Sequence, residues 1–148
     1  MALAVICCLN RATEDELAEH LWRCNSDFLP PLSSRVAIAD YARKLALGAT
    51  RFEAWSADKL VGMVAAYCND REGHAAYISN VSVLNEWTCN GIAGTLLRQC
   101  IAHIAALGLR QIKLEVSSDS KAAISLYEKQ GFTVSSIKEP MIAMRLTL

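Results

Sequence analysis

Apolar and polar residues alternate in several short segments of the chain, and this period of two predicts β-strands. The apolar opening run MALAVICCLN is interpreted as a first strand, and further strands are expected at 51–55, 60–67, 75–83 and 111–116. A turn at 57–59 and a polar loop at 69–74 separate the strands in the first half of the chain. The pattern therefore predicts an antiparallel meander.

Two helices are predicted between the opening run and the meander. Thr13, followed three residues later by Glu16, has the form of a capping box, and the first helix is expected to end near Cys24. The two prolines of segment 25–34 predict a loop, and a second helix is expected from 37 to 47. The aromatic residues of this region are interpreted as packing between the two helices, with one wall of an acceptor pocket as the alternative; they are Trp22, Phe28 and Tyr41.

The stretch 78–97 changes its period at Gly91. Residues 78–83 fit a half-buried strand, and a turn-rich loop follows it. Beyond Gly91 the apolar positions fall on one helical stripe, which consists of Leu96, Leu97, Cys100, Ile101, Ile104 and Leu107. A strand thus enters a glycine-bearing loop that opens a helix. Because the first N–H groups of a helix lack intrahelical acceptors and lie at the positive end of its dipole, this arrangement predicts a site for phosphate or another anion.

The last third of the chain predicts a parallel strand pair and an edge hairpin. A strand, the long helix and the strand at 111–116 follow one another, and this succession is typical of a parallel crossover. A last helix is expected at 121–130, with capping candidates at 117–120 and Gly131 as its left-handed cap. Two final segments predict a hairpin at the sheet edge, namely 132–135 and 141–146.

Composition narrows the class of protein. The 148 residues fit one domain, expected to span 1–148, and 53% apolar residues predict a compact core. Basic and acidic residues balance at 15 each, so no net charge attracts nucleic acid or an anionic membrane. No apolar run approaches the ~20 residues of a membrane span, and the opening run lacks the basic start and cleavage site of a signal peptide. The six cysteines have no paired spacing, which favours free thiols in a reducing cytoplasm, with no metal site.

Two segments together resemble a known family. NEWTCNGIAGTLL resembles the acyl-CoA-binding loop of the GNAT superfamily of N-acyltransferases, and LEVSSDSKAAISLYEKQGF resembles the segment that closes that fold. In the loop, Gly91 and Ala93 match the last two fixed positions of the family. Thr88 stands where the family usually has Arg or Gln, and Cys89 where a further glycine is common. In the second segment Ser120 replaces a frequent Asn, and the matching residues are Leu126, Tyr127, Lys129, Gly131 and Phe132.

The resemblance covers roughly 51–134 and implies both a fold and a ligand. The fold is α+β with three layers, in which about four helices flank a mixed, mostly antiparallel central sheet of six to seven strands. The ligand is acetyl-CoA, with its pyrophosphate on the backbone N–H groups of the loop and its pantetheine arm in a gap beside the strand at 80–83. An N–H of that strand polarises the thioester carbonyl. The expected cofactor-binding residues are Val81, Ser82, Val83, Thr88, Cys89, Asn90, Gly91, Ile92, Ala93, Gly94, Thr95 and Ser120.

The resemblance also implies direct attack of a primary amine on the acetyl thioester. Tyr127 is the candidate proton donor to the CoA thiolate, because a phenol with a pKa near ~10 is protonated at neutral pH; core packing is its alternative role. Glu115 is the candidate base, because the resembling ribosomal-protein N-terminal acetyltransferases have a Glu there. A solvated Glu115, with a water chain as the base, is the alternative. His74 is interpreted as a solvated loop residue.

A different function class competes with the enzyme. The departures at Thr88 and Ser120 motivate an acyl-CoA-binding or regulatory module with weak or no turnover. The acceptor is left open between a small-molecule amine and a protein N-terminus, because the first two helices and the loop between them carry no motif. A homodimer formed through the edge strands is a further hypothesis.

Overall fold

The structure, a computed structural model, describes residues 4–148, and these form one seven-stranded sheet with helices on both faces. The strand order is β1-β2-β3-β4-β5-β7-β6. The strands are β1 (Ile6–Leu9), β2 (Thr50–Ser56), β3 (Lys59–Asp70), β4 (Ala75–Val83), β5 (Gln111–Ser117), β6 (Thr133–Lys138) and β7 (Met141–Thr147). The α-helices are α1 (Glu14–Arg23), α2 (Ile38–Gly48), α3 (Ile92–Ala106) and α4 (Lys121–Lys129).

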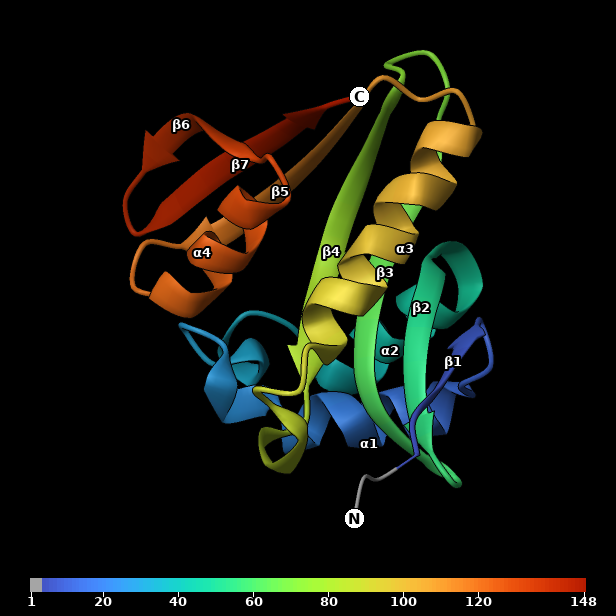
Figure 1. Cartoon of the computed structure of the whole chain (residues 1–148). Helices are drawn as coiled ribbons and strands as arrows, with labels where there is room; N and C mark the ends of the chain where they lie inside the picture. The colour runs from blue at the N-terminus through green and yellow to red at the C-terminus, as the bar shows by residue number, and fades with distance from the viewer. Residues whose placement is uncertain (1–3) are drawn as a thin grey trace.

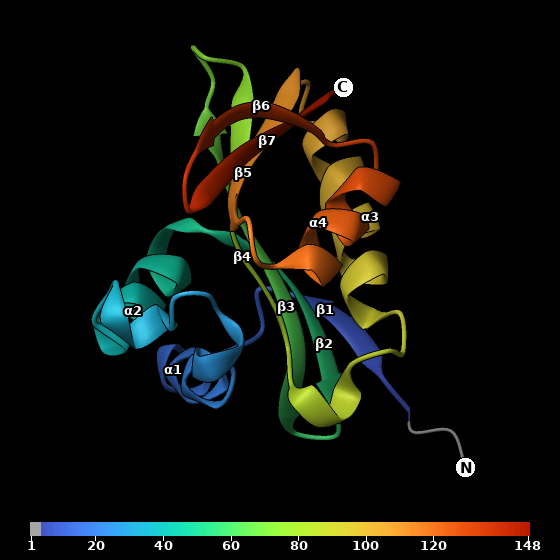
Figure 2. The ribbon, with the colours of Figure 1, turned by 90° about the vertical axis from the view of Figure 1, so that its left-hand side faces the viewer.

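The helices form two layers on the sheet. Figure 2 shows α1 and α2 on one face and α3 and α4 on the other. Each layer encloses its own apolar core, since Val64 of β3 packs toward α3 while its neighbours Met63 and Ala65 pack toward α1 and α2. Among the strands of the described residues, β4 and β5 alone pair in parallel, and the other neighbouring strands are antiparallel. The predicted three-layer fold with a mixed, mostly antiparallel sheet is confirmed, although residues 1–3 of the predicted opening strand lie outside the described part.

The predicted start of α1 is confirmed, whereas one packing prediction beside it is wrong. Thr13 Oγ1 accepts a hydrogen bond from the N–H of Glu16 at 3.2 Å, and Glu16 Oε1 accepts one from the N–H of Thr13 at 3.0 Å. Trp22, however, is 56% exposed. Leu21 is already on the buried stripe, and the next residue lies about 100° further around the helix axis. Phe28 and Tyr41 do pack against the core beneath α1 and α2.

Two further expectations require correction. The segment 25–34 is not a plain loop, because it contains two short 3₁₀-helices, Asn25–Asp27 and Leu32–Ser34. The stripe of α3 is buried as predicted except at Ile101, which is half-buried, and at its end, where Leu107 is 47% exposed because the helix ends at Ala106. None of the described helices is both long and apolar enough to cross a membrane.

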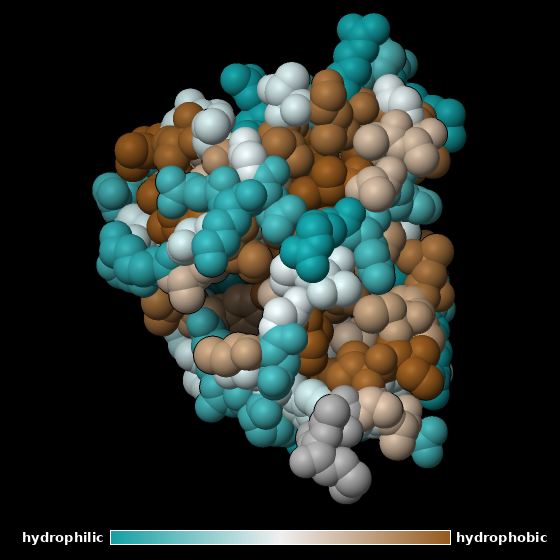
Figure 3. Space-filling view, viewed as in Figure 1, coloured by the Kyte–Doolittle hydropathy of each residue, from teal (hydrophilic) through white to brown (hydrophobic). Residues whose placement is uncertain are grey.

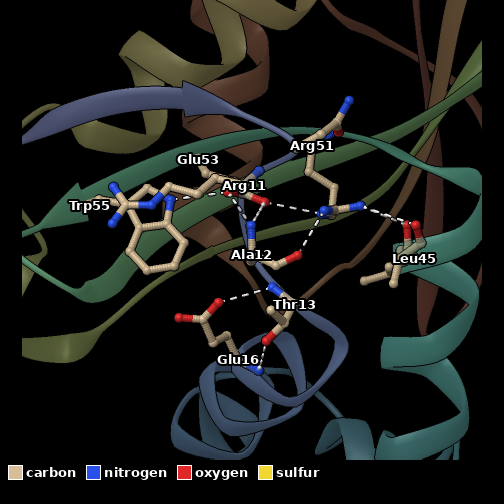
Figure 4. A network of polar contacts seen from close by, with 10 residues as sticks. Arg11, Ala12, Thr13, Glu16, Leu45, Arg51, Glu53 and Trp55 are labelled. Atoms are coloured by element: carbon tan, nitrogen blue, oxygen red, sulfur yellow. Dashed lines mark hydrogen bonds and ion pairs between the residues drawn. The ribbon is translucent and has the colours of Figure 1, made fainter.

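A buried ion pair ties the first helix layer to the sheet (Figure 4). Arg51 Nε donates to Glu53 Oε2 at 3.0 Å, and both residues of β2 are almost fully buried. Glu53 also accepts hydrogen bonds from the N–H of Ala12 at 2.9 Å and from Trp55 Nε1 at 3.0 Å. Arg51 in turn donates to the carbonyl oxygens of Ala12 and of Leu45. The pair therefore holds β2, the segment that enters α1, and the last turn of α2 together.

Candidate active site

The sheet opens where β4 and β5 separate. Residues 75–77 of β4 pair with 111–113 of β5, and no pairing between these two described strands continues beyond that point. Figure 1 shows the two strands diverging toward α4. The half of β4 from Ile78 onward therefore has one edge without a neighbouring strand, and its backbone groups are free to bind a ligand. The predicted gap beside residues 80–83 is present.

A β-bulge lies at the start of this free edge. Ala65 pairs with Asn80 while Ala66 pairs with Ile78, so Ser79 is an extra residue in β4. The extra residue places Val81 on the same face of the sheet as Ile78, in the core under α3 and α4. Asn80 and the next alternate residue, Ser82, consequently face the layer of α1 and α2.

Two cavities meet along this part of β4. One, of about 360 Å³, lies between β4, β5, α4 and the segment that joins α1 to α2. The other, of about 680 Å³, lies between the loop that precedes α3 and the start of α4. Both are lined by Val81, Ser82, Val83, Ser120, Asp27, Leu29 and Ala123. Figure 3 shows a hollow with an apolar floor between α4 and the segment that joins α1 to α2. We call the first the acceptor cavity and the second the loop cavity.

The loop before α3 has the geometry of an anion site. Gly91, the N-cap of α3, has φ +75°, and Cys89 has φ +65°, a conformation in which glycine is favoured. A Cβ atom at Gly91 would have no atom within 4 Å, so the space above this residue is open. Of the residues predicted to bind the cofactor in segment 88–95, those that line the loop cavity are Thr88, Cys89, Gly91, Ile92, Ala93 and Gly94. Asn90 and Thr95 were predicted with them but lie outside that wall.

The polar side chains of this loop bind the loop itself. Thr88 Oγ1 donates to the carbonyl oxygen of Asn85 at 2.8 Å, and Asn90 Nδ2 donates to that of Trp87 at 3.0 Å. The loop therefore offers a ligand its backbone N–H groups rather than side-chain charge. A cation comes instead from α4, since Lys121 lines the loop cavity opposite the loop. Sequence reasoning missed this residue because its position depends on how α4 packs.

Tyr127 of α4 lines the acceptor cavity and is 7% exposed. Its ring lies 5.9 Å from that of Phe132, centroid to centroid. Burial raises the pKa of the Tyr127 phenol to about 12, and no hydrogen bond to the described residues opposes this effect. The hydroxyl group is therefore protonated at neutral pH and can donate its proton to a group inside the cavity.

Glu115 of β5 lines the acceptor cavity from the opposite wall, and its side chain is exposed. It alternates with the buried Leu114 and Val116, as predicted. Tyr77 also lines this cavity. Burial raises the pKa of its phenol, the nearby charge of Glu115 raises it further, and the charge of Arg35 lowers it. The wall near Glu115 thus carries charges of both signs.

The structure also separates the remaining candidates. His74 is exposed in the turn between β3 and β4 and contacts neither cavity wall. Tyr41 lines the acceptor cavity, and its hydroxyl donates to the carbonyl oxygen of Ser79 at 3.0 Å, so it serves both packing and the cavity wall. Asn80, on the strand that was predicted to border the gap, also lines that cavity, as does Asp27, which no local sequence pattern indicates.

The sequence profile of the acetyltransferase (GNAT) family matches residues 14–132, which is most of the chain. The chain belongs to the GNAT family. A mycothiol acetyltransferase of Geodermatophilus obscurus is 37% identical over an 87-residue alignment that covers 55% of this chain and 28% of that protein. The chain thus spans little more than a quarter of the length of this relative.

Solved GNAT structures share the fold over nearly the whole chain. The ribosomal-protein-S18-alanine N-acetyltransferase of Escherichia coli has a TM-score of 0.77 at 19% identity, covering 97% of this chain and 94% of that one. An acetyltransferase of Bacillus subtilis, solved in complex with CoA, has a TM-score of 0.74 at 20% identity and covers 98% and 99%. At these identities the likeness establishes the fold.

Proposed function

We propose that this protein is an N-acetyltransferase that moves the acetyl group of acetyl-CoA to a primary amine by direct attack. The observation that carries the proposal is the meeting of the two cavities along Val81–Val83, beside the free edge of β4. One cavity ends at an anion-binding helix start, and the other contains a buried phenol. A thioester bound along β4 would have its carbonyl group between them.

The loop cavity suits the CoA end of the donor. The free N–H groups at the start of α3 bind the pyrophosphate, and Gly91 lets the backbone approach it closely. Lys121 supplies the charge that Thr88 cannot. The side chain of Ser120, which makes no capping hydrogen bond and lines both cavities, is free to contact the pantetheine arm. The likeness in fold to the Bacillus subtilis acetyltransferase that was solved in complex with CoA supports CoA as the ligand.

The acceptor cavity suits the chemical step. A backbone N–H of β4 near Val83 polarises the thioester carbonyl, and a neutral amine attacks the carbonyl carbon. Tyr127 then donates its proton to the CoA thiolate as the carbon–sulfur bond breaks. Glu115 is a candidate base at the exposed wall of the cavity. The acceptor is a small-molecule amine or a protein N-terminus that fits a cavity of about 360 Å³.

Two measurements on the intact protein test the proposal. Acetyl-CoA at about 100 times its dissociation constant is expected to stabilise the fold by ~2.7 kcal/mol, which a thermal melt detects. A panel of amines, from polyamines to peptides, is then screened for release of free CoA thiol. Absence of stabilisation would overturn the donor assignment. Stabilisation without thiol release from any amine would favour the alternative function of an acyl-CoA-binding module.

A further inference from the structure

A buried histidine outside the proposed chemistry contacts the wall of the acceptor cavity. His20 of α1 is 2% exposed. Its Nε2 lies 2.9 Å from Ser82 Oγ, and its Nδ1 lies 3.3 Å from the carbonyl oxygen of Leu60. Ser82 lines the acceptor cavity, and its Oγ also lies 2.8 Å from Asn80 Oδ1. A continuous polar chain therefore leads from the cavity into the layer between the sheet and α1.

The other side of His20 faces a second opening. His20 and Leu60 line a hollow of about 290 Å³ at the turn between β2 and β3. Its remaining walls are mostly charged and consist of Glu16, Glu19, Arg23, Asp58 and Lys59. The imidazole ring thus lies between the acceptor cavity, which it reaches through Ser82, and this charged hollow.

The contacts determine which ring nitrogen carries a proton. A backbone carbonyl can only accept a hydrogen bond, so the contact with Leu60 requires a proton on Nδ1. Burial lowers the pKa of His20 to about 4, against hydrogen bonds with Leu60 and Ser82, so the ring is neutral at pH 7. Nε2 is then unprotonated and can accept the Ser82 hydroxyl hydrogen, which at rest is donated to Asn80 Oδ1 at 2.8 Å and turns to Nε2 when the relay operates.

We propose that Ser82 and His20 form a proton relay that takes the proton of the acceptor ammonium out of the cavity to the charged hollow. The proposal rests on the proposed acetyltransferase function. An ammonium N–H bonds to Ser82 Oγ and transfers its proton there while the Ser82 hydroxyl proton moves to His20 Nε2. His20 is then doubly protonated, and it releases the Nδ1 proton to water in the hollow. The products are a neutral amine and a proton in solution.

The geometry at Leu60 fits this exit. Its contact with Nδ1, at 3.3 Å, is longer than the usual 2.9–3.0 Å for such a bond, so water can compete for the hydrogen. His20 holds the extra proton only in passage, since its low pKa favours release. After release at Nδ1, the remaining proton is on Nε2, and a flip of the imidazole ring brings the protonated nitrogen to Leu60 and the unprotonated one to Ser82, which restores the resting arrangement.

The charged and titratable groups around His20 do not provide a shorter exit. Cys24 lies 3.9 Å from Nε2, but burial raises the pKa of its thiol to about 12, so it accepts no proton from the ring. The groups that face His20 from the neighbouring elements are Glu16, Glu19 and Arg23 of α1, Cys24 at the C-cap of α1, Asp58 of the β2–β3 turn, Lys59 of β3, and Tyr41 beyond Asn80. The carboxylates among them attract the released proton toward solvent.

Kinetics with two classes of amine test the relay. An alkylamine is protonated at pH 7 and must lose a proton before it attacks, whereas an O-alkylhydroxylamine is already neutral. His20→Gln keeps hydrogen-bonding groups but cannot carry a proton. We expect kcat/KM for the alkylamine to fall by about 100-fold and that for the O-alkylhydroxylamine by less than about 3-fold. The alkylamine defect shrinks as the pH rises toward the pKa of that amine.

Ser82→Ala interrupts the same hydrogen-bond chain while His20 stays in place. We expect the same selective loss of kcat/KM for the alkylamine, so the test does not depend on the folding of a single variant. His103→Gln on α3, outside both cavities and the hollow, is the matched control and leaves both amines unaffected. An equal loss with both amines, no loss, or a selective loss in Glu115→Gln alone would overturn the relay. If the unmodified protein releases no thiol with any amine, the proposed function itself fails.

Discussion

At the scale of single residues, burial decides which side chain can do which chemistry. Tyr127 is enclosed and lacks a hydrogen-bond partner among the described residues, so it keeps its proton. Glu115 is exposed on the opposite wall of the acceptor cavity. His20 is enclosed and stays neutral, yet it contacts Ser82 of the acceptor cavity and also lines the charged hollow. The candidate site thus contains an acid and two candidate bases in distinct environments.

Replacing Tyr127 by Phe removes the proposed proton donor and little else. We expect kcat to fall by roughly 10- to 100-fold while acetyl-CoA binding is retained, because the ring and its packing remain. Thermal shifts with acetyl-CoA and steady-state thiol release measure the two effects separately. An unchanged kcat would assign Tyr127 a packing role.

His20 is expected to make stability depend on acidity. Its pKa falls from 6.5 to about 4 on folding, so folding favours the neutral ring. The contribution of His20 to the free energy of unfolding is fully present above pH 6.5 and is lost as the pH falls toward 4. The loss amounts to roughly 3 kcal/mol, because one pKa unit corresponds to about 1.4 kcal/mol. Urea denaturation of the native protein and of His20→Gln at several pH values isolates this contribution. Parallel pH curves for the two proteins would contradict it.

At the scale of elements, the connection from β4 through the loop into α3 supplies both halves of the donor site. The free edge of β4 begins at a bulge, and α3 begins at a residue with positive φ. The bulge turns Val81 toward the core and Ser82 toward α1. The left-handed Gly91 turns the chain into the helix with its N–H groups exposed to the loop cavity.

The glycines at the two ends of α3 form a matched pair for mutation. Gly91 has φ +75° and Gly108 has φ +82°, and a Cβ atom at either would meet nothing within 4 Å. Alanine at each position should therefore cost a similar ~1 kcal/mol of strain. Only Gly91→Ala should weaken acetyl-CoA binding, because its Cβ would point into the loop cavity. Titration calorimetry checks this, and equal affinities in the two variants would contradict the assignment.

At the scale of the whole molecule, the site exists because the sheet separates into two parts. β1 to β4 carry α1 and α2 on one face, while β5, β7 and β6 form the other part, and the cavities lie at the junction. The walls of the acceptor cavity come from both parts and from the segment between α1 and α2. Attachment of the α1 and α2 layer to β2 is therefore a condition for the site.

Glu53 is expected to be central to that attachment. Glu53→Gln leaves the buried Arg51 without its counter-charge, and removing one partner of a buried pair costs about 3–5 kcal/mol. Glu86→Gln breaks an ion pair with Lys59 whose side chains are 59% and 46% exposed. Such exposed pairs contribute about 0–1 kcal/mol. Urea denaturation compares the two variants, and equal losses would refute the central role of Glu53.

Local interactions in the sequence determined the elements of this protein. The capping box at Thr13, the strand period, and the glycines at 91, 108 and 131 act over a few residues, so they can be recognised in the chain itself. The acyl-CoA loop and the segment around Tyr127 are likewise continuous in sequence, which is why their family resemblance was visible.

Only the tertiary structure decided which distant residues meet. His20 and Ser82 are 62 positions apart and lie 2.9 Å from each other, and Lys121 faces a loop some thirty residues earlier in the chain. The exposure of Trp22 likewise depends on which side of α1 faces the sheet, and the exposure of Leu107 depends on where α3 ends. Packing brings such residues together without any local pattern, because contacts between elements depend on shape and burial rather than on spacing along the chain.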